Sequence, residues 1–565
     1  MKPNESRSGM GRREFLGRMA LAGGALLPIA ATGASAAAGD RKDRRPKVPS
    51  ASRGPHADLE ETTIADLQRA MEAGELSSLE LVRRYRERIE ALDRGGPYLN
   101  SVIEENPDAE AIAASLDAER RAKGPRGPLH GIPVVIKDNI DTADRMCTTA
   151  GSLALLGSRP ARDATVAERL RAAGAVILGK TNLSEWANIR SSRSSSGWSA
   201  RGGQTRNPYE LTRNPCGSSS GSAVAVSANL CVAALGTETD GSIVCPSHVN
   251  GVVGIKPTVG LTSRAGVVPI SHNQDTIGPH ARTVRDAAIL LGALAGADAR
   301  DPATAASEGR FLTDYTRGLD AHALRGARIG VARKTFFGYS AHTDRVIEGA
   351  LAVLKAQGAI LVDPADLPSI EEMSASSAEL EVLLYDLKAD MAAYLATRVP
   401  NPDHRELPMV RTLGQLIAFN EAHRAEEMPF FGQDLFEQAA AKGPLTDPAY
   451  LDALAACRRM GGREGIDAVM DQFELDALVA PTGGPAWPTD HVNGDHFLGA
   501  SSSAAAIAGY PLINVPAGTA FGLPIGISFM GRAWSEPTLI KLAYAFEQAS
   551  RGRKVPEYRE EPEGA

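Results

Sequence analysis

Apolar residues recur along the chain with two periods, and the alternation of these periods predicts an α/β protein. Spacings of three and four, typical of amphipathic helices, run through residues 64–71 and 79–92, with Gly74 between them. Short apolar runs bounded by turn residues are typical of buried strands. Such runs lie at residues 134–136, 176–178, 231–235, 329–331, 360–362, 477–481, 513–516 and 525–529.

Helical patterns lie between these runs. The helix predicted at residues 344–357 is flanked by two strand patterns, which indicates a strand–helix–strand unit. Thr165 and Glu168 have the spacing of a capping box at the start of another helix. Residues 260–283 are rich in turn residues, and residues 370–470 are mainly helical in pattern. We interpret residues 370–470 as a helical insertion that shapes substrate access. Other helices are predicted at residues 108–123, 284–295 and 537–548.

Two clusters of small residues lie within residues 214–257, on either side of one apolar segment. The first cluster, at 217–221, contains three serines, and the second, at 239–242, ends in a serine. A short buried helix at 223–229 and a strand at 231–235 would fold the chain back and bring both clusters together. Glycine beside serine lets backbone N–H groups approach a reacting carbonyl, as an oxyanion hole requires. The alternative is a Gly/Ser-rich loop without chemistry.

Lys137 ends the apolar run at residues 134–136, and Asp138 and Asn139 follow it. Lysine is usually a surface residue, but a core strand would carry this side chain into the interior. Loss of solvation there lowers the pKa of an ammonium group, so the amine can act as a base. Lys137 is therefore a candidate general base.

Two stretches match known motifs in letters but not in context. Residues 174–181 match G-x-x-x-x-G-K-[ST], yet in a phosphate loop the strand precedes the first glycine, whereas here the strand pattern lies between the glycines. Residues 217–221 match the nucleophile elbow G-x-S-x-G, which needs a strand before it. Residues 210–215 are polar and end in Asn-Pro, which favours a turn. Neither nucleotide binding nor an α/β-hydrolase elbow is predicted.

The N-terminus resembles a twin-arginine export signal. Arg-Arg-Glu-Phe-Leu at residues 12–16 precedes an apolar run at 19–31 and an Ala-Ser-Ala sequence at 34–36. A signal over residues 1–36 predicts an exported protein, periplasmic or secreted. The apolar run is too short to cross a bilayer, so no membrane span is expected. Residues 37–57 are small and basic, as is typical of a flexible start of the mature chain.

Length and charge narrow the class of protein. The chain has 565 residues, enough for one large α/β domain or two or three smaller ones. Its net charge is −7, and loss of residues 1–36 leaves 56 Lys and Arg against 66 Asp and Glu, a net charge of −10. Such an acidic chain argues against nucleic acid as a partner. Its five cysteines lack metal-ligand spacing and are expected as buried thiols, with one disulfide left open.

Hydrolysis at a serine needs a base, and the usual base is histidine. His248 and His272 lie nearest the serine clusters in sequence, and a triad histidine stays open at this point. No pair of residues has H-E-x-x-H or another metal spacing, so neither a metal nor a cofactor is expected. The alternative base is a lysine that acts through a second serine.

Several motifs together resemble the amidase signature family, over about residues 59–550. The resemblance implies a single large α/β domain, in which helices cover both faces of a mixed central sheet. It places the domain at residues 58–555, with a signature core at 130–290, and leaves a C-terminal tail at 556–565. The motifs are Gly131-Ile132-Pro133 with Lys137-Asp138-Asn139, Gly179-Lys180-Thr181-Asn182 with Glu185, Gly217-Ser218-Ser219-x-Gly221, Thr239-x-Gly241-Ser242-Ile243, Gly254-Ile255-Lys256-Pro257-Thr258, Ala508-Gly509-Tyr510-Pro511 and Gly522-Leu523-Pro524.

The resemblance also implies the roles of the site residues. Lys137 would be the base, Ser218 the bridging serine and Ser242 the nucleophile that forms an acyl-enzyme. It further implies an oxyanion hole of backbone N–H groups, from Thr239, Asp240, Gly241 and Ser242, and supporting positions at Ser219 and Asp138.

The chain departs from the commonest family pattern at several positions: Cys216, Ser220, Glu238, Asp240 and Val244. The carboxylate of Asp240 should disfavour acidic groups nearby. The sequence Glu-Thr-Asp-Gly-Ser-Ile-Val-Cys-Pro is similar to that of bacterial peptide amidases, which remove the C-terminal amide of peptides. This similarity favours C-terminal peptide amides as substrates and ammonia as the product.

Three alternatives stay open. A broader amidase would cleave acylamides, anilides or carbamates. An amidotransferase-type subunit, similar to the A chain of glutamyl-tRNA amidotransferase, fits poorly with an export signal and an acidic chain. A non-catalytic binding protein would leave Lys137 and both serines without a role. We expect a small-molecule or peptide amide as the partner, and a monomer or homodimer.

Overall fold

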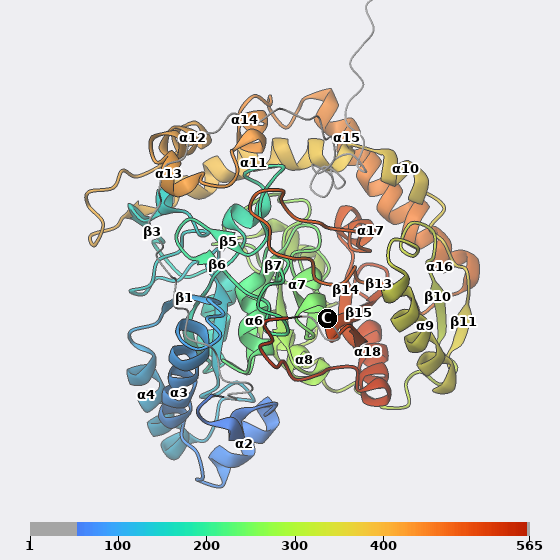
Figure 1. The fold of residues 1–565 in the computed structure, drawn as a ribbon, viewed down its shortest axis with the longest axis horizontal. Coiled ribbons are helices and arrows are strands. Elements are labelled where there is room, and N and C mark those ends of the chain that lie inside the picture. Colours follow the sequence, from blue (N-terminus) through green and yellow to red (C-terminus); the bar gives the residue numbers. More distant parts are fainter. Residues whose placement is uncertain (1–53, 562–565) are drawn as a thin grey trace, which may run out of the picture.

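One large mixed sheet forms the centre of the molecule (Figure 1). The computed structural model describes residues 54–561, so the predicted signal at 1–36 and residues 37–53 lie outside the described residues. Eleven strands make up the sheet, in the order β1-β4-β2-β7-β9-β8-β14-β15-β13-β10-β11. Helices cover both faces, which confirms the predicted fold class. Within residues 54–561, no helix combines the length and the apolar character that a membrane span needs.

Three adjacent parallel strands end at the same edge of the sheet. β2 (Pro133–Lys137) lies between β4 (Val176–Thr181) and β7 (Ala233–Glu238) and is parallel to both. Every residue of the three strands is buried, as expected for parallel strands covered on both faces. The residues that follow these strands meet at one edge, where the sites of α/β proteins commonly form.

The rest of the sheet is mostly antiparallel. The exception is a parallel strand–helix–strand unit at the far edge, built from β10, α9 (Ala341–Ala356) and β11, which confirms that prediction. The strands outside the central three are β1 (Val102–Glu105), β9 (Thr276–Ala281), β8 (Val253–Lys256), β14 (Leu512–Ala520), β15 (Leu523–Met530), β13 (Ala477–Pro481), β10 (Arg328–Val331) and β11 (Ile360–Val362).

Helices pack on both faces of this sheet. α6 (Ser220–Ser227) and α7 (Val244–Val249) contact each other and the central strands, and every residue of both helices is buried. Neither helix therefore has the polar stripe of a surface helix. α8 (Val284–Leu294), α9 and α18 (Glu536–Ser550) cover the opposite face.

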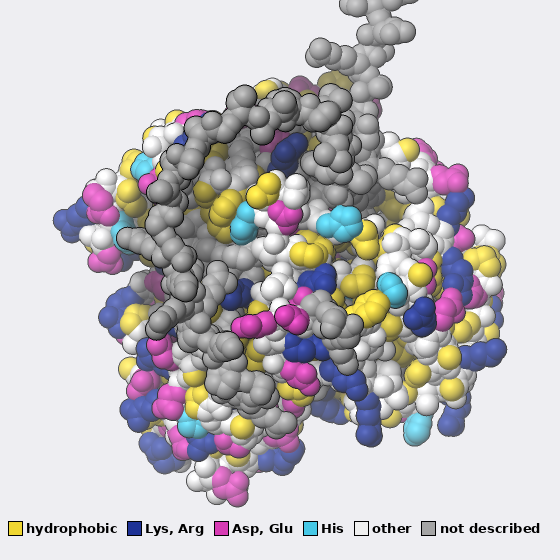
Figure 2. All heavy atoms as spheres, in the orientation of Figure 1, with side chains coloured by type: hydrophobic (Ala, Val, Ile, Leu, Met, Phe, Trp, Pro, Cys, Tyr) yellow, Lys and Arg dark blue, Asp and Glu magenta, His cyan; other side chains and the backbone are white. Residues whose placement is uncertain are grey.

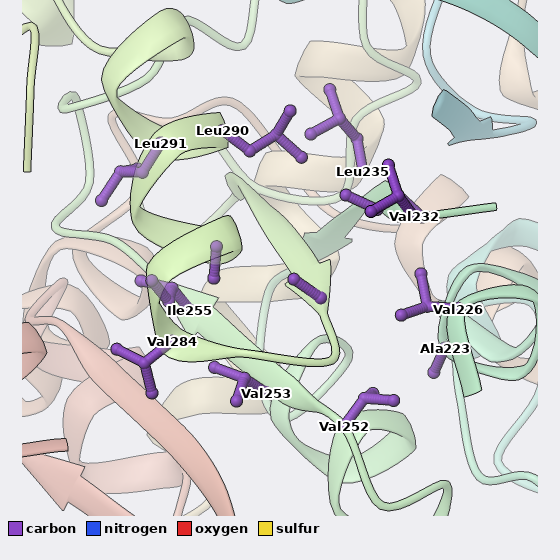
Figure 3. Close-up of a cluster of buried hydrophobic side chains, with 14 of the residues drawn as sticks. Ala223, Val226, Val232, Leu235, Val252, Val253, Ile255, Val284, Leu290 and Leu291 are labelled. Atoms are coloured by element: carbon purple, nitrogen blue, oxygen red, sulfur yellow. The ribbon is translucent and has the colours of Figure 1, made fainter. Parts of the chain in front are cut away.

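Strand β8 shows how alternate residues serve the two layers. Val253 and Ile255 join the apolar cluster that includes Val284 of α8 (Figure 3). Gly254, between them, faces α7, where an added Cβ would lie 2.2 Å from Oγ of Ser247. Glycine at this position lets α7 pack closely on the sheet, which fixes the loop before that helix.

The segment predicted as a helical insertion forms a layer above the sheet edge, drawn in gold and orange in Figure 1. Leu384 and Leu387 of α11 share an apolar cluster with Trp186 and Ile189 from the main body. The helices of this layer are α10 (Ile370–Ala375), α11 (Ala378–Ala396), α12 (Leu413–Ala422), α13 (Arg424–Glu427), α14 (Asp434–Ala440), α15 (Pro448–Arg458) and α16 (Asp467–Phe473).

The N-terminal helices begin and end close to their predicted residues. α2 (Ile64–Glu72), α3 (Ser78–Arg88) and α4 (Ala109–Lys123) lie together at the lower left of Figure 1. On the face drawn in Figure 2, acidic and basic side chains are interspersed over the outer helices, while hydrophobic side chains gather nearer the centre.

The predicted capping box at Thr165 is wrong. Thr165 is the first residue of α5 (Thr165–Ala172), and Ala164 occupies the N-cap. The hydroxyl of Thr165 binds Asp298 instead, and Glu168 pairs with Arg300 at 2.7 Å. Tertiary partners therefore outcompete the local cap.

The interpretation of residues 260–283 as turns misses strand β9. Gly278 and Pro279 lie inside this strand, and both residues are typical of turns. An added Cβ on Gly278 would lie 1.9 Å from the carbonyl oxygen of Ile255 in β8. The glycine is thus required by the close approach of a neighbouring backbone.

Candidate active site

Lys137 lies at the end of β2, fully buried, with its amine directed at hydroxyl groups. Nζ donates to Oγ of Ser218 at 2.7 Å and to Oγ1 of Thr237 at 2.9 Å. It also lies 3.3 Å from the carbonyl oxygen of Thr237. The structure therefore joins two of the predicted site residues, Lys137 and Ser218, which are 81 positions apart in sequence.

Burial decides the protonation of this lysine. Loss of solvation lowers the pKa of Lys137 to about 7, while the carboxylates of Asp275 and Glu238 act in the opposite direction. A large fraction of the amine is therefore neutral at neutral pH. A neutral amine 2.7 Å from a hydroxyl oxygen can accept its proton.

Ser218 and Ser219 lie between the end of the Gly/Ser loop and α6. The peptide bond between Gly217 and Ser218 is cis. The backbone N–H of Ser219 donates to the carbonyl of Ser242 at 3.1 Å, and its hydroxyl donates to the carbonyl of Thr237 at 3.1 Å. These bonds bring the two serine clusters side by side, as the sequence predicted.

Ser242 lies in the loop between β7 and α7, and Glu238 holds this loop in place. One carboxylate oxygen of Glu238 accepts the backbone N–H groups of Ile243 at 2.7 Å and Val244 at 3.0 Å. Gly241 has a φ of +81°, a conformation that favours glycine. Sequence reasoning registered Glu238 only as a departure from a pattern, because its acceptor role depends on where the chain turns.

A cavity of about 200 Å³ opens beside these residues. Its floor includes the oxyanion-loop residues 239–242, and Ser502 and Ser503 donate to the carboxylate of Asp240 at 2.5 and 2.6 Å. Its walls are mainly apolar and come from the main body, the insertion and the segment before α17 (Ser503–Ala508). The apolar lining residues are Ile189, Ile270, Leu380, Leu383, Leu435, Trp487 and Phe497.

Asp138, predicted as a supporting residue, does not line the cavity. Its carboxylate accepts the hydroxyl of Thr149 and the N–H of Gly151, the latter at 3.2 Å. Its carbonyl accepts the N–H groups of Thr149 and Ala150 at 3.1 and 3.0 Å. Asp138 thus anchors the loop that follows β2, on the side away from the serines.

A disulfide joins the two serine clusters. The Cα atoms of Cys216 and Cys245 are 6.0 Å apart, and both residues line the cavity. Cys216 precedes Ser218 and Cys245 follows Ser242, so the bridge ties both loops together. The remaining cysteines in the described chain, Cys147, Cys231 and Cys457, are buried thiols. The sequence left this pairing open, because a separation of 29 residues says nothing about which loops meet.

Histidine does not take part in this arrangement. His248 is buried with both ring nitrogens bound to backbone, 2.7 Å from the carbonyl of Gly484 and 2.7 Å from the N–H of Gly526. His272 pairs with Asp390 outside the cavity. No histidine lies among the cavity-lining residues of the described chain, and residues 54–561 hold no group of three metal-ligating side chains.

The stretch that matches a phosphate loop forms a strand, as predicted. Residues 176–181 are β4, and Lys180 is buried. Its amine donates to the carbonyl of Ile140 at 2.5 Å and to the hydroxyl of Thr148 at 2.8 Å. Lys180 therefore connects two loops and does not reach the cavity.

Comparisons with known proteins agree with this geometry. The family model described as Amidase matches residues 80–540. The native peptide amidase of Stenotrophomonas maltophilia, a solved structure, is 55% identical with a TM-score of 0.83, over 88% of this chain and 99% of its own. An Arabidopsis thaliana protein named a probable amidase is 45% identical, over 88% of this chain and 92% of its own length.

One amidotransferase component is also similar to this chain. The A-type component of the glutamyl-tRNA(Gln) amidotransferase of Halorhodospira halophila is 35% identical, over 88% of this chain and 99% of its own length. The family match spans most of the chain, including the strands that carry Lys137, Ser218 and Ser242 to one cavity. The chain therefore belongs to the amidase signature family of amide hydrolases.

Proposed function

We propose that the chain hydrolyses amides through an acyl-enzyme on Ser242, with Ser218 as a proton relay and Lys137 as the base. The observation that carries the proposal is the 2.7 Å contact between Nζ of Lys137 and Oγ of Ser218, next to the loop of Ser242. A pKa of about 7 supports a neutral Lys137 at neutral pH.

The proposed reaction has two halves. In the first, Lys137 accepts a proton from Ser218, Ser218 accepts the proton of Ser242, and Oγ of Ser242 bonds to the amide carbon. The C–N bond breaks, and the proton returns through Ser218 to the leaving ammonia. In the second, a water gives its proton to the same relay and adds to the ester, and the bond to Oγ breaks. Amide and water become carboxylate and ammonium.

The negative oxygen of each tetrahedral intermediate would lie against backbone N–H groups at the start of α7. Glu238 supports this arrangement because its carboxylate holds the N–H groups of Ile243 and Val244, which fixes the loop before them. Each preorganised donor contributes roughly 2.7 to 4 kcal/mol to transition-state stabilisation. The proposed donors are Thr239, Asp240, Gly241 and Ser242.

We further propose C-terminal peptide amides as the substrates. The 55% identity to a peptide amidase supports this class, and so does the apolar cavity wall, which suits the side chains of a peptide. The carboxylate of Asp240 lines the floor, fixed by two serine hydroxyls. A negative floor favours an uncharged amide over a free C-terminal carboxylate.

The Ser242→Ala variant tests the nucleophile. We expect it to release no ammonia from an N-blocked dipeptide amide that the wild type hydrolyses, and to leave no acyl adduct by mass spectrometry after acid quench. Ser227→Ala makes the same chemical change at the end of α6, away from the cavity, and should keep its activity. Retained ammonia release by Ser242→Ala would place the nucleophile elsewhere.

A substrate panel separates this proposal from the two other enzyme classes. Faster turnover of anilides or carbamates than of peptide amides would favour a broader amidase. Ammonia release from glutamine only, with none from peptide amides, would favour an amidotransferase-type subunit, to which the chain is 35% identical. We expect peptide amides to give the highest kcat/KM.

We also propose export through the twin-arginine signal at residues 1–36. The disulfide between Cys216 and Cys245 supports an oxidising destination, because cytosolic thiols are kept reduced. Fractionation of the native producing cell should place the mature chain outside the cytoplasm, and Arg12→Lys with Arg13→Lys should retain it inside. Mature chain outside the cytoplasm in that double variant would rule out the twin-arginine route.

A further inference from the structure

Asp275, which precedes β9, binds the proposed oxyanion loop and a wall of the cavity at the same time. Oδ1 accepts the hydroxyl of Thr239 at 2.6 Å. Oδ2 accepts the backbone N–H groups of Ile270 at 2.8 Å and Ser271 at 3.0 Å. Nε2 of the adjacent Gln274 lies 3.4 Å from the carbonyl of Thr239. Thr239 is thus held through both its side chain and its backbone.

These contacts connect residues that face the substrate. Thr239 and Ile270 both line the cavity, and the carboxylate of Asp275 is their shared partner. Three donors converge on this carboxylate, which is acceptor-only when ionised. An amide at the same position has one acceptor oxygen, so it cannot satisfy all three donors.

The strand register brings Asp275 to the base as well. Thr276 pairs with Glu238, so Asp275 lies beside Thr239, two residues after the Thr237 that Lys137 binds. The carboxylate interacts with the buried amine of Lys137 and favours its charged form.

The other titratable groups around Lys137 and Asp275 leave this interaction in place. Glu238 also favours the charged amine, but its Oε2 is bound to two backbone N–H groups. Burial lowers the pKa of His280 to about 3, so its ring is neutral. On the far side of Asp275, Arg264 pairs with Asp301.

We propose that Asp275 is a positioning residue for amide hydrolysis, which fixes Thr239 in the oxyanion loop and, through its negative charge, holds the proton on Lys137. The proposal rests on the function proposed above for Lys137 and the oxyanion loop. It assigns to one carboxylate both the geometry of the oxyanion site and the pH at which the base becomes active.

The expected effect appears in a pH–rate profile. For an amide that the wild type hydrolyses, Asp275→Asn should lower kcat at least tenfold and move the acid limb of kcat/KM to lower pH, because the amine loses its proton more easily without the anion. Asp390→Asn removes a carboxylate from the second cavity, of about 430 Å³, that Asp275 also lines. This control should leave both kcat and the limb unchanged.

The conservative variant separates charge from shape. Asp275→Glu keeps the charge but displaces the acceptor oxygens, so it should lower kcat and keep the acid limb near that of the wild type. A folded Asp275→Asn enzyme whose acid limb stays in place would overturn the proposal. An Asp275→Glu limb that moves as far as that of Asp275→Asn would overturn it as well.

A variant outside Asp275 decides the case if Asp275→Asn does not fold. Thr239→Val keeps the backbone donor and the charge but loses the hydroxyl, and we expect kcat to fall severalfold with little change in KM. A wild-type kcat in this variant would overturn the positioning role. Failure of the wild type to hydrolyse any amide would contradict the proposed function instead, so the two failures are distinguishable.

Discussion

At the scale of single residues, burial alone does not distinguish the proposed base. Lys137, Lys180 and Lys256 are all fully buried. Burial lowers the pKa of Lys256 to about 8, close to the value for Lys137, but the amine of Lys256 binds the carbonyl of Tyr510 at 2.7 Å. A carbonyl has no proton to give. Lys137 differs because it reaches the hydroxyl of Ser218, which has one.

The titration of Lys137 gives a pH prediction. The active form is the neutral amine, and its pKa is about 7. Activity should therefore rise as the pH increases through about 7 and fall below it, with kcat/KM losing tenfold per pH unit on the acid side. Lys137→Met should lower kcat by about 10² to 10⁴ and remove this limb. An acid limb near pH 7 that persists in Lys137→Met would assign it to another group.

A second prediction concerns the charge of Asp240. Asp240→Asn keeps an acceptor oxygen near Ser502 but loses the charge, so the carboxylate product should bind more tightly. We expect the inhibition constant of the peptide acid to fall about tenfold, which corresponds to about 1.4 kcal/mol. Inhibition by the uncharged peptide alcohol should stay constant. An unchanged constant for the peptide acid would remove Asp240 from substrate selection.

At the scale of elements, the local pattern predicts strands well where both neighbours pack through side chains, as in β2 and β7. It fails at β9, where Gly278 and Pro279 imitate a turn. The cause is a contact with the backbone of β8, which no local pattern contains. The same limit applies to the site, because Asp275 and Glu238 act through loops whose positions depend on strand order.

The disulfide supports a prediction at this scale. It closes a loop of about 30 residues, and loop entropy then stabilises the folded state by roughly 3 to 4 kcal/mol. Reductant should lower the unfolding midpoint of the wild type but not that of Cys245→Ser, measured by urea denaturation. Five free thiols in the unreduced, denatured wild type would contradict the bridge between Cys216 and Cys245.

At the scale of the whole molecule, the helical layer completes the cavity that the sheet begins. Arg190 of the main body is central to this contact. Its guanidinium lies 2.8 Å from the carboxylate of Glu185, both side chains being fully buried, and 4.2 Å from the ring centre of Phe431. Its carbonyl accepts the N–H of Leu435, a residue of the cavity wall.

Loss of Arg190 should therefore affect both stability and substrate binding. Arg190→Met leaves Glu185 buried without its cation, and breaking such a pair costs about 3 to 5 kcal/mol. We expect a lower unfolding midpoint and a higher KM, because the wall at Leu435 shifts. Arg424→Met removes an exposed ion pair with Glu421 and should cost less than about 1 kcal/mol. Equal losses in the two variants would contradict a special role for Arg190.

The sequence by itself determined the α/β class, most of the helices and strands, and the candidate residues Lys137, Ser218 and Ser242. Apolar periodicity and the spacing of small residues are local properties, so they can be read along the chain. The tertiary structure decided the contact between Lys137 and Ser218, the pairing of Cys216 with Cys245, and the partners of buried carboxylates. These depend on which loops meet at the edge of the sheet, and strand order sets that.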